Sequence, residues 1–164
     1  MEDLSGIKDK KTRAKVEAFL KRESKKLSPE EKEEIKALEK VALNLWRLGV
    51  RARAGYKCEV PDCGKTKLVN AHHIESYITN RWLRYDPENG ICLCLTHHKF
   101  GWLSAHKSFC FMFNLLKAVR DYSLKYLLLN YGERRVLTKA DLLEIIAGLK
   151  QYEGGKRTYK RGKK

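Results

Sequence analysis

Four of the five histidines in the sequence stand as two adjacent pairs. The first pair is His72 and His73, the second is His97 and His98, and both fall within residues 70–101. Histidine is the commonest metal ligand among the side chains, and it gains or loses its proton near neutral pH without being perturbed. Two such pairs in one short segment indicate metal binding and proton transfer at the same place.

Three cysteines add a second set of metal-binding side chains to this region. Cys58 and Cys63 flank the residues EVPD, and Cys94 and His97 flank two residues. Two ligand pairs on two short turns, about thirty residues apart, fit a tetrahedral structural Zn²⁺ site of three thiolates and one imidazole. Cys92 could compete with His97 for the fourth position. Because a small motif buries little surface, such a site would supply folding free energy.

The two histidines of each pair are expected to point in different directions. Neighbouring side chains in a strand face opposite sides of the sheet, and neighbours in a helix point about 100° apart. His97 could therefore face the zinc while His98 faces elsewhere. One histidine of the first pair and His98 could then converge on a second metal ion, which leaves the other histidine of that pair free to act as a base.

Capping residues and apolar spacing predict the elements that position these side chains. Ser28 and Glu31 form a capping-box pattern, and Thr138 and Asp141 repeat it. We expect helices over 29–53, 108–131 and 139–152, short strands within 67–74 and 91–95, and the start of a helix over 96–106. The residues expected in the core include Trp46, Trp82, Trp102, Cys92 and Cys110. The predicted fold class is α+β, mainly helical, with a small ββα metal motif and its zinc knuckle flanked by helices.

The distribution of charge and pattern divides the chain into three parts. They are a charged N-terminal arm over 1–27, one domain over 28–152 and a basic tail over 153–164 that is expected to be disordered. The domain consists of a core motif over 54–107 with flanking helices over 29–53 and 108–152.

The formal net charge of +15 is concentrated after the first forty residues. Residues 41–164 carry 23 Lys and Arg against 10 Asp and Glu. A positive field on this scale favours nucleic acid as a partner, although a solubilising surface would have the same composition. The N-terminal sequence MEDLSGIKDKKTRAK is too charged for a secretory signal, and no apolar run is long enough to cross a membrane. We therefore expect a soluble, cytoplasmic protein with reduced cysteines.

The spacing of the candidate residues resembles that of the HNH, or ββα-metal, endonucleases. The matching segments are AHHI, ENG with Asn89, and LCLTHH, in which Asn89 and His98 are nine positions apart as in that family. The cysteine pairs are similar to those of the zinc-knuckle branch, which is common in phages and prophages. The resemblance covers about residues 47–107, and the helices on either side are not part of it.

The resemblance implies a role for each matching residue. His73 corresponds to the general base that activates water, and Asn89 to the residue that holds the loop and helps to orient the base. His72 and His98 correspond to the ligands of a catalytic divalent cation. Availability in the cell favours Mg²⁺ or Mn²⁺ as this cation, while imidazole ligands are also compatible with Ni²⁺ or Zn²⁺.

The sequence departs from the family pattern at two positions, and the pattern does not fix the role of two further residues. His97 replaces the usual fourth cysteine of the knuckle, and Trp102 stands where some members place another histidine. His106, two helical turns after the helix ligand, could be a third ligand, a phosphate contact or a capping residue. Arg84 could contact a phosphate or pair with Asp86.

The activity that the resemblance implies is hydrolysis of DNA phosphodiester bonds, by nicking or double-strand cutting, with weak sequence specificity. DNA is the expected partner, and a phage packaging or recombination complex in a bacterial host could provide targeting. Two alternatives stay open. One is a non-catalytic, zinc-stabilised DNA-binding module, and the other is a nuclease that uses the same centre on junctions or RNA. The sequence does not predict the oligomeric state.

Overall fold

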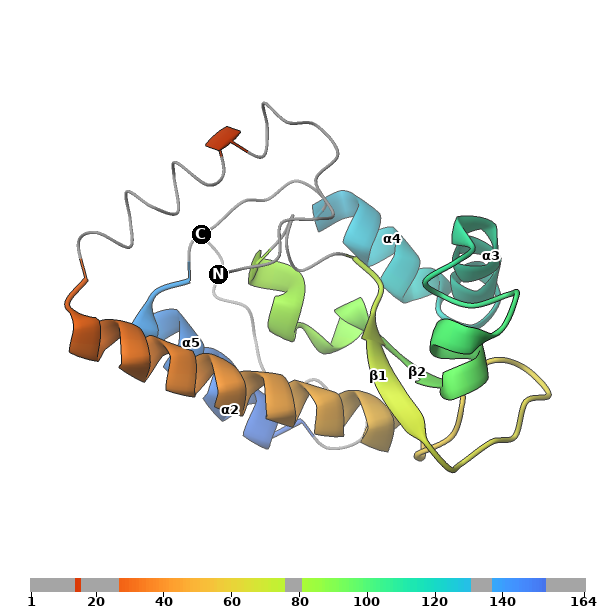
Figure 1. Ribbon diagram of the computed structural model, residues 1–164, viewed down its shortest axis with the longest axis horizontal. Helices are drawn as coiled ribbons and strands as arrows, with labels where there is room; N and C mark the ends of the chain where they lie inside the picture. Colours follow the sequence, from red (N-terminus) through yellow and green to blue (C-terminus); the bar gives the residue numbers. More distant parts are fainter. Residues whose placement is uncertain (1–13, 16–26, 76–80, 131–136, 153–164) are drawn as a thin grey trace.

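The computed structural model of the chain describes residues 14–15, 27–75, 81–130 and 137–152. The elements in these ranges are α2 (Pro29–Arg53), β1 (Val69–His73), η1 (Arg81–Tyr85), η2 (Pro87–Asn89), β2 (Gly90–Cys94), η3 (Thr96–Phe100), α3 (Phe109–Val119), α4 (Asp121–Asn130) and α5 (Lys139–Lys150). Figure 1 shows α2 and α5 on one side of the two-stranded sheet and α3 and α4 on the other. The predicted α+β, mainly helical class is confirmed at this level.

Helix α2 begins and ends where the sequence predicts. The Ser28 hydroxyl accepts a hydrogen bond from the Glu31 N–H, and the Glu31 carboxylate accepts one from the Ser28 N–H, so the capping box is formed. The helix ends at Arg53, and Gly55 follows with a φ of 58°, in the left-handed region that glycine tolerates best. The helix packs against α5, both strands and the turns η1 and η2.

Strands β1 and β2 pair antiparallel in the register that places His73 opposite Gly90. Both strands lie where the sequence predicts, and β2 is buried along its whole length. Helix α2 packs so closely on Gly90 that a β-carbon there would overlap the side chains of Val50 and Trp46. Glycine at this position therefore sets the distance between the long helix and the sheet.

The helix predicted over 96–106 is wrong in length, because only the single π-helical turn η3 forms. The Gly101 N–H donates to the Thr96 carbonyl at 2.7 Å, and the chain then leaves the helical region at φ −69° and ψ 161°. A β-carbon at Gly101 would lie 2.7 Å from the Thr96 carbonyl oxygen. No other residue fits that contact without a shift of the backbone, so the glycine ends the turn.

The helix predicted over 108–131 is also wrong, because it divides into α3 and α4 at Arg120. Arg120 is the C-cap of α3, and its φ of −143° and ψ of 41° lie outside the helical region, so α3 ends there. Its guanidinium lies 3.2 Å from the Glu59 carboxylate and 3.1 Å from the Glu88 carboxylate. Apolar spacing continues through this position, so the break depends on partners that are distant in the sequence.

Helix α5 closes the core against α2. It begins with the predicted capping box of Thr138 and Asp141. The helix lies beside α2 in Figure 1 and buries Leu142 and Ile146. Helix α2 thus packs against both strands on one side and against α5 on the other.

Two residues that were expected in the core lie on the surface. Trp46 and Cys92 are buried and Trp82 is half-buried, whereas Trp102 and Cys110 are exposed. Trp102 follows Gly101, the residue that ends η3, and its side chain is 95% exposed. Cys110 stands in the first turn of α3, whose buried residues are Met112, Leu115 and Leu116.

The predicted disordered tail over 153–164 lies outside the described residues, and so does the N-terminal arm over 1–27 apart from residues 14–15 and 27. None of the helices in the described ranges is long and apolar enough to cross a membrane.

Candidate metal and catalytic centre

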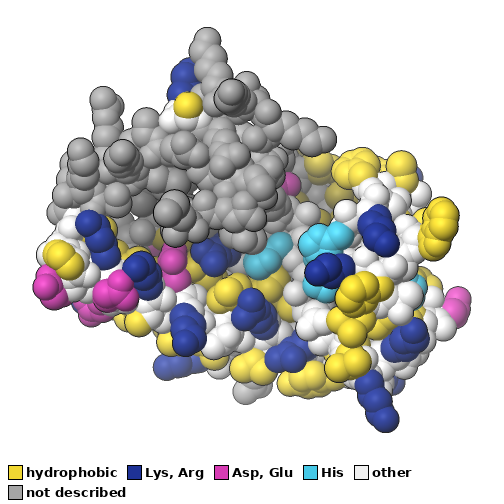
Figure 2. Space-filling model, in the orientation of Figure 1, with side chains coloured by type: hydrophobic (Ala, Val, Ile, Leu, Met, Phe, Trp, Pro, Cys, Tyr) yellow, Lys and Arg dark blue, Asp and Glu magenta, His cyan; other side chains and the backbone are white. Residues whose placement is uncertain are grey.

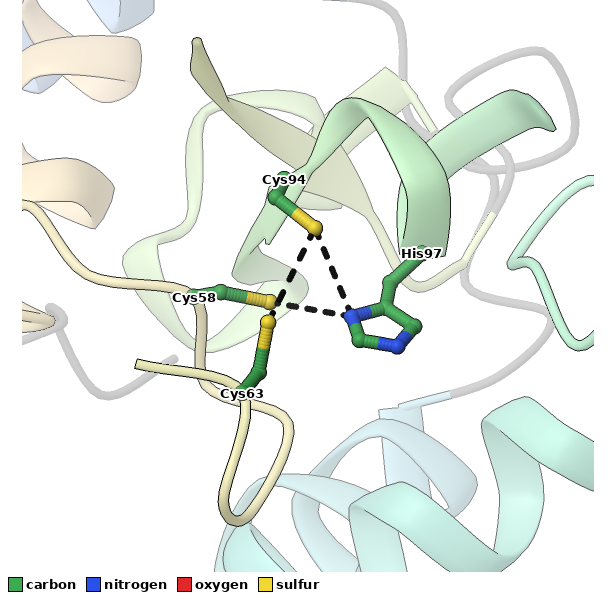
Figure 3. Close-up of side chains that lie close together, drawn as sticks. All are labelled: Cys58, Cys63, Cys94 and His97. Carbon is green, nitrogen blue, oxygen red and sulfur yellow. Dashed lines mark hydrogen bonds between the residues drawn. The ribbon is translucent and has the colours of Figure 1, made fainter. Parts of the chain in front are cut away.

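Four cysteine and histidine side chains converge between the loop after α2 and the start of η3, as Figure 3 shows. They are Cys58, Cys63, Cys94 and His97. The Sγ atoms of Cys63 and Cys94 are 3.9 Å apart, and Nδ1 of His97 is 3.4 Å from the Sγ of Cys58 and 3.4 Å from that of Cys94. All four ligand atoms lie within 4.8 Å of one another.

These separations fit one zinc ion at the centre of the group. With Zn–S bonds of about 2.3 Å and a Zn–N bond of about 2.0 Å, a tetrahedron places two sulfurs about 3.8 Å apart and a sulfur and nitrogen about 3.5 Å apart. The measured separations are 3.9 Å and 3.4 Å. Three thiols and one imidazole are also a donor set that structural zinc sites use. The predicted group could therefore hold a metal ion such as zinc, with His97 rather than Cys92 as its fourth member.

A tight loop presents the first two cysteines of the group. The Cys63 N–H donates to the Val60 carbonyl at 3.2 Å, which closes a turn after Cys58. Asp62 and Gly64 adopt φ values of 60° and 61° on either side of Cys63. Aspartate and glycine enter this left-handed region more readily than most residues, so the loop sequence itself favours the conformation.

Burial and hydrogen bonding act in opposite directions on the thiols. Burial raises the pKa of the Cys58 thiol to about 12, which keeps it protonated at neutral pH. Burial also acts to raise the pKa of Cys94, but hydrogen bonds from the backbone of His97 and from the thiols of Cys58 and Cys63 outweigh it and lower the pKa. A metal ion binds thiolates, so binding here releases protons and weakens as the pH falls.

Three histidines form a second group on the other side of η3. His72 comes from β1, His98 from η3 and His106 from the segment before α3, and their ligand nitrogens all lie within 4.8 Å of one another. The ring centroids are 4.9 Å apart in each of the three pairs. The Nε2 atoms of His98 and His106 are 3.2 Å apart, close to the separation of about 3.3 Å for two imidazole nitrogens on one tetrahedral ion. The arrangement could hold a metal ion.

His106 reaches this group because the chain folds back, and not because a helix continues for two turns. The Ala105 N–H donates to the His97 carbonyl at 2.8 Å, and the His106 N–H donates to the His98 carbonyl at 3.3 Å. The turn at Gly101 makes this return possible. His106 therefore belongs to the group that could hold a metal ion, and which of its three open roles it has stays a prediction.

The environment favours the neutral, metal-binding form of two of these histidines. Burial, together with the neighbouring imidazoles of His98 and His106, lowers the pKa of His72 to about 3. Burial also lowers the pKa of His98, with contributions from His106 and Lys99. Neutral imidazole is the form that coordinates a metal ion, so both rings are in the ligand form at neutral pH.

His73 lies against α2, on the opposite face of β1 from His72. Its ring stacks on the indole of Trp46, with centroids 3.8 Å apart and planes 5° from parallel. Its Nε2 is 2.8 Å from the Arg84 carbonyl oxygen, and because a carbonyl can only accept, Nε2 carries the proton and Nδ1 is the basic nitrogen. Burial lowers the pKa of His73 to about 4, so the ring is neutral at pH 7.

Asn89 is fully buried and joins the end of β1 to η1. Its Oδ1 accepts a hydrogen bond from the Glu75 N–H at 2.6 Å, and its Nδ2 donates to the carbonyls of Glu75 and Leu83, both at 3.0 Å. Leu83 immediately precedes Arg84. One buried amide therefore fixes the part of the chain whose carbonyl holds the ring of His73.

Arg84 turns its side chain toward α2. Its Nη1 is 4.0 Å from a carboxylate oxygen of Glu39, and its guanidinium carbon is 5.5 Å from the centroid of the Tyr85 ring. Both side chains of the ion pair are largely buried. The contribution of Arg84 to the candidate centre is thus its carbonyl, and a contact between its side chain and a phosphate stays a prediction.

Two features of this region were not predicted from the sequence. Trp46 was expected only as a core residue, yet it forms one face of the environment of His73. Glu59, between the first two cysteines, accepts a hydrogen bond from the Cys92 N–H at 2.6 Å and pairs with Arg120. The spacing of residues in the sequence does not predict contacts between separate elements. The acidic residue between two cysteines of a basic chain could nevertheless have suggested a structural role for Glu59.

Comparison with known proteins adds no match: the sequence matches no protein-family model and no curated protein, and the structure matches no solved structure. The resemblance to the HNH endonucleases therefore rests on the residues of this chain alone.

Proposed function

We propose that this protein is a metal-dependent endonuclease that hydrolyses phosphodiester bonds of DNA. The observation that carries the proposal is the convergence of His72, His98 and His106, whose ligand nitrogens lie within 4.8 Å of one another beside a second cysteine and histidine group. The division of each histidine pair supports it, because His97 belongs to one group and His98 to the other. The net charge of +15 supports a polyanionic substrate.

In this proposal His73 is the general base. Its Nδ1 accepts a proton from water, the water oxygen attacks phosphorus, the bond from phosphorus to the 3′ oxygen breaks, and the leaving oxygen takes a proton from solvent. The Arg84 carbonyl, held through Asn89, keeps the proton of the ring on Nε2. A divalent cation held by His72, His98 and His106 would neutralise charge on the phosphate and on the leaving oxygen.

The donor set also bears on which cation is used. Carboxylate and water ligands suit Mg²⁺, whereas imidazole ligands favour later transition ions. With His106 as a third nitrogen donor, the proposal favours Mn²⁺, Ni²⁺ or Zn²⁺ over Mg²⁺ at equal free concentration. Availability in the cell acts in the opposite direction for the last two.

Cleavage of supercoiled plasmid tests the proposal, with EDTA, Mg²⁺, Mn²⁺, Ni²⁺ and Zn²⁺ in parallel. The wild type is expected to nick or linearise the plasmid only with a cation. His98→Ala removes a donor and is expected to need at least about tenfold more cation. His73→Phe keeps an aromatic ring on Trp46 but has no proton acceptor. It is expected to cut at least about 100-fold more slowly than the wild type. Thermal unfolding of each variant shows whether the fold is kept.

Two results would contradict the proposal in different ways. If the wild type retards plasmid on a gel but cuts with no cation, the zinc-stabilised DNA-binding module is the better description. If His73→Phe cuts at the rate of the wild type, the chain is a nuclease whose base is another group. Competition among duplex, junction and RNA substrates then separates the remaining alternatives.

A further inference from the structure

The segment that joins His98 to His106 carries a cluster of exposed apolar side chains. Trp102 is 95% exposed, Phe100 65% and Leu103 63%. A tryptophan side chain releases much free energy when it leaves water, so such exposure beside a candidate active site marks a surface for a partner.

The backbone of this segment is held in place, so the exposed side chains belong to a defined surface. The Gly101 N–H donates to the Thr96 carbonyl at 2.7 Å, and the Ala105 N–H to the His97 carbonyl at 2.8 Å. Inside the loop, Ser104 is buried and its hydroxyl donates to the Lys99 carbonyl at 3.3 Å. These bonds fix the loop before a ligand arrives, which lowers the entropic cost of binding.

The charge around the cluster favours a polyanion. Residues 89–120 contain no Asp or Glu. The exposed ammonium group of Lys99 is 5.9 Å from the centroid of the Phe100 ring, and that of Lys107 donates to the Phe100 carbonyl at 3.2 Å. Figure 2 shows Lys or Arg and hydrophobic side chains bordering histidines on this face. Aromatic rings among cations are the arrangement on which single-stranded nucleic acids stack.

The cluster is within reach of DNA bound at the three histidines. Trp102 is four residues from His98 and four from His106. Its Cα therefore lies within about 14 Å of the Cα of each, since an extended chain spans at most about 3.5 Å per residue. At about 3.4 Å of axis per nucleotide in a strand, that is roughly four nucleotides.

We propose that Trp102, with Phe100 and Leu103 around it, stacks on an unpaired base of DNA close to the phosphate that is cleaved. Paired bases in a duplex cover each other's faces, so the stack needs a base that is unpaired or displaced. The preferred substrate is then DNA with an unpaired stretch beside the cut. This inference rests on the proposed function for the position of the cut, but the stacking itself does not require cleavage.

Binding in EDTA tests the stacking apart from catalysis. Fluorescence anisotropy is measured with labelled oligo-dT and with a labelled duplex of equal length, at one salt concentration, for the full chain. Trp102→Ala is expected to weaken oligo-dT binding about tenfold and duplex binding much less, because stacking contributes on this scale per base. Trp102→Phe is expected to restore most of the affinity. Tyr122→Ala, which removes an aromatic ring of α4 that is 69% exposed, is the matched control and is expected to bind as the wild type does.

The same set of variants also identifies the results that overturn the inference. It is wrong if Trp102→Ala binds oligo-dT as tightly as the wild type, or if it loses affinity for both DNA forms by the same factor. It is also wrong if vesicles with anionic lipid bind through Trp102 and oligo-dT does not. Loss of oligo-dT affinity in Trp102→Ala supports the stacking surface even if plasmid is never cut, so the two proposals fail separately.

Discussion

At the scale of single residues, Cys58 and Cys110 provide a test of whether Cys58, Cys63, Cys94 and His97 bind zinc. Cys58 is buried among the ligand atoms and Cys110 is exposed in α3. Cys58→Ser is expected to lose bound zinc and to lower Tm by roughly 10 °C, because losing even about 3 kcal/mol has that effect in a domain of this size. Cys110→Ser is the matched control and is expected to keep both. Zinc content by atomic emission and unfolding by circular dichroism check this, and equal zinc in the two variants would exclude Cys58 as a ligand.

The candidate ligands could be predicted from the sequence because their chemistry and spacing are local. Two cysteines on a turn, and a cysteine and a histidine two residues apart, need no knowledge of the fold to be read as donor pairs. The position of His106 beside His72 and His98, and the stacking of Trp46 on His73, could not be predicted in this way. Both depend on contacts between segments whose relative positions the tertiary fold decides.

At the scale of elements, Arg120 joins the C-terminal helices to the metal motif. Its guanidinium contacts Glu59 in the knuckle and Glu88 in η2, and also Ser123 in α4. The side chains of all three ion-pair members are mostly buried. Arg120→Ala leaves two such carboxylates without this partner, and is expected to lower the free energy of unfolding by about 3 kcal/mol. Urea unfolding followed by circular dichroism measures the change.

Lys125→Ala is the matched control for that experiment. Lys125 pairs with Asp121 one turn earlier in α4, and both side chains are largely in solvent. Removing it is expected to change stability by less than about 0.5 kcal/mol. If Arg120→Ala is no more destabilising than Lys125→Ala, the ion pairs do not anchor α4 to the motif.

The N-terminal ends of α2 and α5 could be predicted because their capping residues act locally. Ser28 with Glu31 forms one capping box, and Thr138 with Asp141 forms the other. The break at Arg120 and the early end of η3 could not. Apolar periodicity runs through Arg120 without interruption, and only the contacts with Glu59 and Glu88 identify it as a boundary. At Gly101 the sequence contained a signal, since glycine often ends a helical turn, but the expected helix was extended through it.

At the scale of the whole molecule, we expect charge to decide how strongly the proposed endonuclease binds DNA without regard to sequence. The basic tail over 153–164 holds six of the 35 Lys and Arg residues and one acid. The first forty residues, by contrast, carry 12 Lys and Arg against 10 Asp and Glu. The balance of charge in these two regions could be predicted from composition alone, because long-range electrostatics depends little on the details of packing. The contribution of each region to the affinity for DNA is therefore expected to depend on how many phosphates it contacts.

The salt dependence of duplex binding answers that question. Each phosphate that the protein neutralises contributes about −0.9 to the slope of log affinity against log salt concentration. Replacing the six basic residues of the tail by serine in the full chain is expected to make this slope shallower by about 2 or more. Replacing six lysines of the N-terminal arm in the same way is the matched control, and is expected to change the slope less because acidic neighbours already offset them. Anisotropy titrations in EDTA at several salt concentrations measure both, and an unchanged slope for the tail variant would mean that the positive charge of the domain alone binds the duplex.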